Sequence, residues 1–176
     1  MVPIWVGPQV CPNYTGETLI PTSNAYQAGV DEGANTSNMM NLDGLQGPGA
    51  YDLEPFVNDC SYNMSDVESF ISGWDANLKA NGFYPVLYGS TGASDLTQFA
   101  SISSVPDAIY GADWDGVSNV DDLSPVPSGY WVNNQRYKQF QGNVYETYDA
   151  ATIRVDNDCA GSLVWTDNSV YPTNCA

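Results

Sequence analysis

The stretch that decides the fold is AYDLEPF, residues 50–56, in which two carboxylates stand two positions apart in an otherwise apolar run. Side chains at positions i and i+2 of a strand point to the same side of the sheet. Asp52 and Glu54 should therefore project together from the end of a strand, which Pro55 terminates because proline cannot donate to the ladder. Burying two neighbouring acids is costly. The pattern indicates catalysis, a metal ion or a solvated cleft, and it favours carbohydrate chemistry.

Outward from this stretch, apolar runs bounded by glycine and proline alternate with segments of helical spacing. The runs predict about six strands: residues 3–7, the run around Tyr51, and residues 83–88, 108–114, 135–141 and 152–156. Helices are predicted at 23–45, interrupted by Gly29 and Gly33, at 65–81 and at 93–101. Residues 65–68, SDVE, have the capping-box pattern that starts a helix. Strands that alternate with helices are typical of a parallel α/β architecture.

The composition predicts a single acidic domain over residues 1–176. Hydrophobic residues make up 43% of the 176, which is enough for a core, and no composition break marks a second domain. With 21 acidic residues, 4 basic residues and a net charge of −17, the chain is not expected to bind nucleic acid or an anionic membrane. The absence of histidine excludes a Ser-His-Asp triad and a histidine zinc site within it. Acid–base chemistry would use carboxylates or tyrosines.

The cysteines favour an exported protein, secreted or on the cell surface. No apolar run is long enough to span a membrane, and residues 1–9 read as a strand rather than a signal peptide. Cys11 and Cys60 each follow a predicted strand, so a disulfide between them is plausible, and Cys159 and Cys175 bracket the C-terminal tail. Four cysteines allow three pairings, and the sequence does not choose among them. The chain contains no C-x-x-C motif, so a metal site built from its cysteines is not expected. No cofactor is expected either.

A second acidic pair, Asp156 and Asp158, follows the last predicted strand. If all strands were parallel, this pair would meet Asp52 and Glu54 at one mouth, because the carboxyl ends of parallel strands share one edge. The functional interpretation is a pair of acids for glycosidic bond cleavage. The alternatives are solvated acids at strand ends, or a calcium loop in the case of Asp156 and Asp158.

Aromatic and amide side chains could complete a sugar site at this mouth. Asp113 and Trp114 follow a strand, and Gln139 and Gln141 should face the interior together because they alternate with Phe140. Candidate substrate-binding residues are Tyr88, Asp113, Trp114, Gln139, Gln141 and Trp5. For any one aromatic side chain, core packing is the commoner fate.

The order of six segments resembles a known family: residues 3–7 (PIWVG), 51–54 (YDLE), 82–88 (GFYPVLY), 112–114 (ADW), 139–142 (QFQG) and 153–158 (IRVDND). This family is the glycoside-hydrolase-like domain found in an exported mycobacterial cell-envelope protein, formerly a domain of unknown function, which is similar to the family-25 lysozymes. The resemblance implies an incomplete TIM-like (β/α) barrel with about six parallel strands and with acids at its C-terminal mouth.

The resemblance also implies roles for individual residues. Glu54 corresponds to the general acid, Asp52 to its partner and Asp156 to the acid that ends the last strand. Tyr88 and Gln139 correspond to residues that line the mouth. The first two β/α units of the family, with an acid at the end of the first strand, have no counterpart, so the chain is expected to begin at the third strand.

Three hypotheses follow from these observations. The first is a secreted lysozyme-like O-glycosyl hydrolase that acts on cell-wall or extracellular glycan. The second is a catalytically inactive carbohydrate-binding module on the same barrel, which the missing first strand and its acid favour. The third is a structural surface protein, in which self-assembly or a partner covers the open barrel edges.

Overall fold

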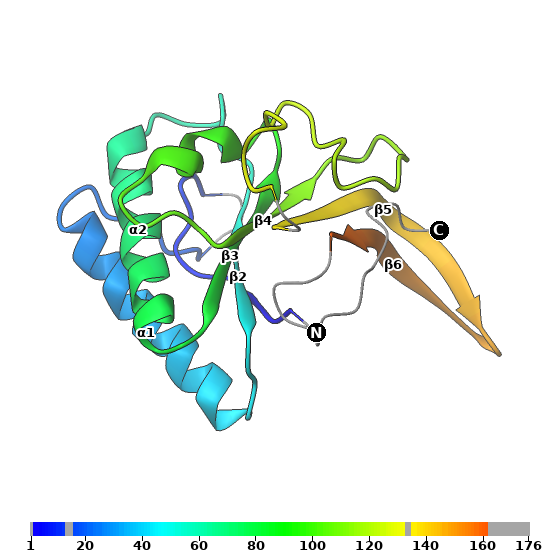
Figure 1. Cartoon of the computed structure of the whole chain (residues 1–176), viewed down its shortest axis with the longest axis horizontal. Helices are drawn as coiled ribbons and strands as arrows, with labels where there is room; N and C mark the ends of the chain where they lie inside the picture. The colour runs from blue at the N-terminus through cyan, green and yellow to red at the C-terminus, as the bar shows by residue number, and fades with distance from the viewer. Residues whose placement is uncertain (1, 13–15, 133–134, 162–176) are drawn as a thin grey trace.

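The computed structural model describes residues 2–12, 16–132 and 135–161, and it shows a mixed α/β fold built on one six-stranded sheet (Figure 1). The strands lie in chain order across the sheet, which curls into a half-barrel. The elements are β1 Ile4–Trp5, α1 Ala25–Leu42, β2 Pro48–Leu53, α2 Met64–Ala80, β3 Tyr84–Ser90, the 3-10 helix η1 Leu96–Ser101, β4 Ala108–Ala112, β5 Arg136–Tyr148 and β6 Ala151–Ala160. Alternating strands and helices were predicted correctly.

The direction of the last strand corrects the sequence prediction. Strands β1 to β5 are parallel, whereas β6 runs antiparallel to β5. Tyr148 pairs with Ala151, so only two residues connect the strands, and such a tight connection joins antiparallel strands only. The prediction of about six parallel strands is therefore wrong by one strand. The open half-barrel is consistent with an incomplete barrel.

The two long helices pack against each other on one face of the sheet (Figure 1). A Cβ atom added to Gly29 would lie 1.9 Å from the Phe70 carbonyl oxygen, and one on Gly73 would lie 2.1 Å from the carbonyl oxygen of Tyr26. Glycine at these positions lets the two backbones touch. The prediction that Gly29 and Gly33 interrupt the first helix is wrong, because α1 is continuous through both.

Helix α2 begins one residue before the predicted start. Its N-cap is Asn63, whose side-chain oxygen accepts a hydrogen bond from the Ser65 backbone N–H at 3.3 Å. The predicted capping box, which made Ser65 the cap, is wrong for that reason. Asparagine is as good a cap as serine, because its short side chain reaches the same free donors.

The main core lies between the sheet and these helices. Tyr51 and Leu53 of β2 point into it and are fully buried, with Phe70 and Trp74 of α2 among their neighbours in the core. The residues that alternate with them on β2 face the concave side, where Ala50, Val86, Ala108 and Tyr110 form a second, smaller cluster. The concave side is therefore the face on which Asp52 and Glu54 lie.

A loop, rather than a helix, covers the outer face of β4 and β5. Lys138 is 0% exposed, and its ammonium group donates to Asp115 Oδ2 at 2.9 Å and to the Asp122 carbonyl oxygen. Arg136 donates to the carbonyl oxygens of Pro127 and Tyr130. Two buried cations thus fix a segment that has no regular structure of its own. None of the helices in the described part of the chain is long and apolar enough to cross a membrane.

Candidate active site at the carboxyl ends of the strands

One row of side chains crosses the concave face of the sheet. In the register of the strands, Asp52 is opposite Tyr88, Tyr88 is opposite Tyr110, and Tyr110 is opposite Tyr137. The Tyr88 and Tyr110 rings meet edge to face with their centroids 5.0 Å apart, and the Tyr110 and Tyr137 centroids are 5.6 Å apart. Three tyrosines therefore lead from the acidic end of β2 across to β5.

Asp52 is the acid whose surroundings disfavour ionisation most clearly at this mouth. Burial first, and then the charges of Glu54 and Glu17, raise the pKa of Asp52 from 3.8 to about 6. Its Oδ1 atom is buried, and no described residue donates a hydrogen bond to it. A carboxyl group in these surroundings keeps its proton in mildly acidic solution, as a general acid must.

Gln9, which the sequence analysis did not select as a site residue, fixes the end of β2. Its Nε2 atom donates to the Asp52 carbonyl oxygen at 2.8 Å, and its Oε1 atom accepts from the Glu54 backbone N–H at 3.0 Å. The buried amide thus binds the backbone on both sides of Leu53 and holds the two acids in place. No periodic signal marks Gln9, because its partners lie more than forty residues away in the sequence.

Gln139 connects the two sides of the mouth. Its Oε1 atom accepts from the Tyr88 hydroxyl at 3.1 Å and from the Trp114 indole N–H at 2.7 Å, and its Nε2 atom donates to Asp156 Oδ2 at 3.3 Å. The side chain is 5% exposed. Its amide is therefore engaged by protein groups at both ends, which suits a positioning residue better than a direct sugar ligand.

Three carboxylates act on the phenol of Tyr88. Burial, followed by the charges of Asp52, Glu54 and Asp156, raises the pKa of Tyr88 to about 12, and the hydrogen bond to Gln139 opposes the shift. The acids come from opposite ends of the curled sheet. Asp52 is opposite Tyr88 in the register, and Gln139 binds both the Tyr88 hydroxyl and Asp156, so the fold brings acids from β2 and β6 to one mouth.

Strand β6 contributes two acids to this mouth. Asp156 Oδ1 accepts from the Asn143 backbone N–H at 2.7 Å, in addition to the bond from Gln139. Burial raises the pKa of Asp158, and a hydrogen bond with Tyr110 opposes that rise. Burial, followed by the same interaction with Asp158, raises the pKa of Tyr110, a residue that the sequence analysis did not select.

A cleft of about 430 Å³ opens at the carboxyl ends of β2, β3 and β4. Its walls include Glu54, Tyr88, Asp113 and Trp114, together with Leu53, Pro55, Ser90, Thr91 and Ala112. Trp114 is 59% exposed, so more than half of this residue's surface remains open to a ligand. Burial raises the pKa of Asp113, and the Lys138 ammonium group, 3.8 Å from its Oδ2 atom, opposes the rise.

Two predicted site residues lie away from this cleft. Trp5 points toward the helices, since it is in register with Tyr51, and its indole N–H donates to Glu32 Oε1 of α1 at 2.7 Å. Gln141 is exposed on the β5–β6 hairpin, where its Oε1 atom accepts from Asn157 at 3.0 Å. Irregular register between Gln139 and Gln141 breaks the alternation that predicted a shared face.

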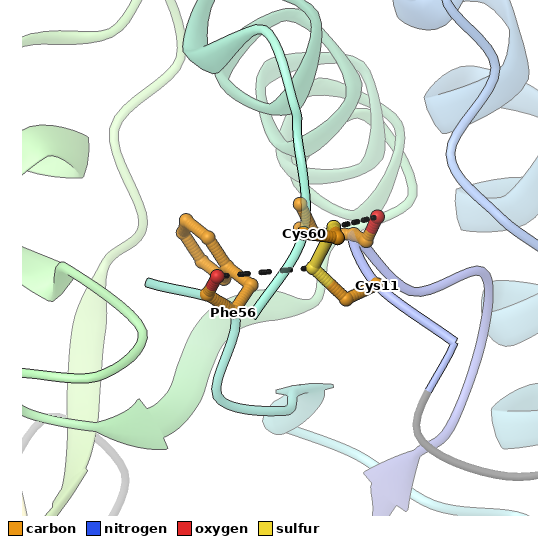
Figure 2. The surroundings of a disulfide bond; sticks show 4 residues. Cys11, Phe56 and Cys60 are labelled. Carbon is orange, nitrogen blue, oxygen red and sulfur yellow. Dashed lines mark hydrogen bonds between the residues drawn. A yellow bond between two sulfur atoms is a disulfide. The ribbon is translucent and has the colours of Figure 1, made fainter. Parts of the chain in front are cut away.

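The disulfide between Cys11 and Cys60 ties the segment after β1 to the segment after β2 (Figure 2). The two Cα atoms are 5.8 Å apart, and the Cys11 sulfur lies 3.7 Å from the Phe56 carbonyl oxygen. This pairing was one of the possibilities open from the sequence, and it is confirmed. Cys159 is also disulfide-bonded, whereas Cys175 lies outside the described residues. Within the described part of the chain, no group of three or more acidic or cysteine side chains is arranged as a metal site.

Comparisons with known proteins agree with the resemblance found in the sequence. No curated protein matches the chain significantly. A 1.07 Å crystal structure of an uncharacterized B. stearothermophilus protein is similar at 14% identity and a TM-score of 0.48, over 89% of this chain and 83% of that one, which is too weak to support an argument. Residues 1–160 match the family described as Rv2525c-like, glycoside hydrolase-like domain. The chain therefore belongs to the Rv2525c-like family of glycoside hydrolase-like domains.

Proposed function

We propose that this protein is an exported O-glycosyl hydrolase that cleaves chains of amino sugars in a cell wall or another extracellular glycan. The observation that carries the proposal is the geometry of the mouth, where Asp52 is opposite Tyr88 in the register, Gln139 binds both the Tyr88 hydroxyl and Asp156, and Glu54 lines the adjoining cleft. Glycosidases cleave their bond with a proton donor and a second carboxylate on either side of it. Family membership supports a carbohydrate-related function.

In this proposal Glu54 protonates the leaving glycosidic oxygen, because Glu54 is the acid of the first pair that lines the cleft. Asp52 stands beside it on the same face of β2 and retains a proton to about pH 6. At mildly acidic pH the proton on Asp52 is therefore available for transfer beside Glu54. Gln9 keeps both acids at the strand end through its backbone contacts.

Asp156 would serve as the second carboxylate, acting on water or on the developing positive charge of the sugar ring. Its two oxygens accept from Gln139 and Asn143, which fixes the orientation of the carboxylate. Tyr88 remains a neutral phenol because its pKa is about 12. The exposed face of Trp114 would support a sugar ring at the rim of the cleft.

Charge and compartment support the same substrate class. A net charge of −17 would repel a polyanionic glycan, whereas an uncharged amino-sugar chain would not be repelled. The Cys11–Cys60 disulfide is compatible with export. The proposal treats the half-barrel as the substrate-binding half of a TIM-like barrel, in which active sites form at the carboxyl ends of the strands.

The test is release of reducing ends from purified peptidoglycan and from chitin oligomers, measured for the wild type, Glu54→Gln and Glu68→Gln. We expect Glu54→Gln to lose about 10²- to 10⁴-fold in turnover, the range that general acid catalysis contributes, with an unchanged melting temperature. Glu68→Gln makes the same chemical change on helix α2, away from the cleft, and should leave the rate unchanged. Full activity in Glu54→Gln would refute the proposal.

A second candidate function is glycan binding without cleavage. It is favoured by the engagement of both Asp156 oxygens with protein donors, which leaves less of that carboxylate free for chemistry. The assay above separates the two, since a binding module would retain the oligomer and release no reducing ends. In that case Trp114→Ala should weaken retention, while Glu54→Gln should hardly change it.

A further inference from the structure

The β5–β6 hairpin extends beyond the body of the molecule as an arm (Figure 1). Strand β5 pairs with β4 through residues Arg136 to Gln139 only, whereas its pairing with β6 continues to Tyr148. Register irregularities fall between Gln139 and Gln141 and between Gln141 and Val144. Bulges of this kind bend a strand and increase its twist, which accounts for the departure of the arm from the sheet.

One face of this arm continues the candidate site outward. Strand β6 alternates regularly, so Asp158, Asp156, Arg154 and Thr152 lie on one face. Arg154 is opposite Tyr145 in the register, and the Thr152 and Thr147 hydroxyls are hydrogen-bonded at 3.0 Å. From Asp156 to Thr152 the strand advances about 14 Å, which is room for further sugar rings beyond the cleft.

The side chains of this face suit an uncharged sugar. Tyr145 is 71% exposed, so its ring is open to a ligand as that of Trp114 is at the root of the arm. A Cβ atom on Gly142 would lie 2.5 Å from the Trp114 ring, so this indole lies against the arm itself. The two exposed aromatic rings therefore flank Asp156 on a single surface.

Arg154 adds hydrogen-bond donors to the same surface. Of the four basic side chains, Lys138 and Arg136 are buried, and Lys79 is 3.2 Å from Asp107 in an ion pair. Arg154 is exposed and makes no ion pair in the described part of the chain. A guanidinium group beside an open aromatic ring can donate to hydroxyl and amide oxygens of a ring stacked there.

We propose that Tyr145 and Arg154, with Thr147 and Thr152, form an arm subsite that binds uncharged amino-sugar rings of a glycan running out of the cleft. This inference rests on the proposed function and refines it, because it makes a long chain the preferred ligand. The surface is continuous from Asp156 to the arm. Tyr145 supplies a ring on which a sugar can stack, and Arg154 supplies hydrogen-bond donors to it.

The arm offers a matched control for the test. Tyr148 is 56% exposed and stands on the same strand as Tyr145, but three positions along and therefore on the opposite face, where its hydroxyl donates to Glu146. The affinities of chitobiose and chitohexaose are measured by calorimetry for Glu54→Gln, which leaves the oligomers uncleaved, and for the same variant with Tyr145→Ala or Tyr148→Ala added. Both substitutions remove an exposed tyrosine, so the comparison isolates the face of the arm.

We expect Glu54→Gln and its Tyr148→Ala derivative to bind the hexamer about tenfold more tightly than the dimer, and the Tyr145→Ala derivative to lose that gain without a change in dimer affinity. Equal hexamer affinities for Glu54→Gln and its Tyr145→Ala derivative, with dimer binding intact, would overturn the arm subsite and leave the proposed function standing. If neither oligomer binds Glu54→Gln, the arm subsite fails, and the proposed function fails with it only if the wild type also releases no reducing ends from either substrate.

Discussion

Tyr88 shows how single residues organise the mouth of the half-barrel. Its ring packs against Tyr110, its hydroxyl donates to Gln139, and the charges of three carboxylates raise its pKa to about 12. A phenol of this kind stays neutral at neutral and mildly acidic pH. It therefore separates the acids with a group that neither loses a proton nor adds charge to the cleft.

Asp52 lowers the stability of the fold by an amount that depends on pH. Because burial raises its pKa from 3.8 in the unfolded chain to about 6, the folded state binds more protons between these values. The stability associated with this group is fully present below about pH 4 and is lost as the pH rises through 6. Ionised Asp52 therefore destabilises the fold at neutral pH.

We expect Asp52→Asn to melt at a higher temperature than the wild type at pH 8, and the two melting temperatures to converge near pH 4. Asp59→Asn, the same change at an exposed position, should follow the wild type at both pH values. Thermal unfolding followed by circular dichroism provides the measurement. A stabilisation by Asp52→Asn of equal size at pH 4 and pH 8 would contradict the pKa argument.

The sequence predicted residues of the site where local alternation decides direction. Asp52 and Glu54 are two apart on a regular strand, so their shared face followed from spacing alone. Trp5 and Gln141 could not be placed in this way. The direction of Trp5 depends on which side of the sheet carries α1, and the bulge that turns Gln141 away has no local signature.

At the scale of elements, the contact between α1 and α2 carries much of the packing. Gly29 and Gly33 of α1 and Gly73 of α2 allow backbone contact, although glycine inside a helix costs about 1 kcal/mol relative to alanine. The sequence analysis treated Gly29 and Gly33 as interruptions because local propensity says nothing of a partner helix. The tertiary contact decides the outcome here.

Gly29→Ala should therefore destabilise the protein by about 2 kcal/mol or more, although the substitution raises helix propensity. The added methyl group would lie 1.9 Å from the Phe70 carbonyl oxygen, so the helices must move apart. Urea unfolding gives the free energy of unfolding. Asn38→Ala on the exposed side of α1 serves as control and should be neutral or stabilising. An unchanged free energy of unfolding for Gly29→Ala would contradict a close backbone contact between the two helices.

The sequence pattern predicts where the last two strands lie but does not predict the direction of β6. Apolar runs located both last strands, but alternation is the same in parallel and antiparallel strands, so only the short connection at Tyr148–Ala151 fixes the direction. The expectation that Asp156 reaches the mouth rested on parallel strands. The structure brings Asp156 there by the antiparallel route instead, next to Gln139.

At the scale of the whole molecule, the half-barrel gathers acids from distant parts of the chain at one mouth, and Glu54 and Asp113 line the cleft there. Asp52 lies near the end of β2 and Glu54 directly follows it, whereas Asp156 lies on β6, about a hundred residues later, and Gln139 connects the two sides. The loop over β4 and β5, held by Lys138 and Arg136, supplies Asp113 and Trp114 to the same cleft. The central claim is that these distant parts act on one glycan.

The most direct test of this claim is the rate of reducing-end release by Asp156→Asn from the substrate that the wild type cleaves. Asp149→Asn makes the same change in the connection at the tip of the arm and is the control. We expect Asp156→Asn to lose about 10²-fold or more in turnover with an unchanged melting temperature, and Asp149→Asn to keep the wild-type rate. Wild-type turnover by Asp156→Asn would contradict the central claim, because Asp156 would then have no part in cleavage.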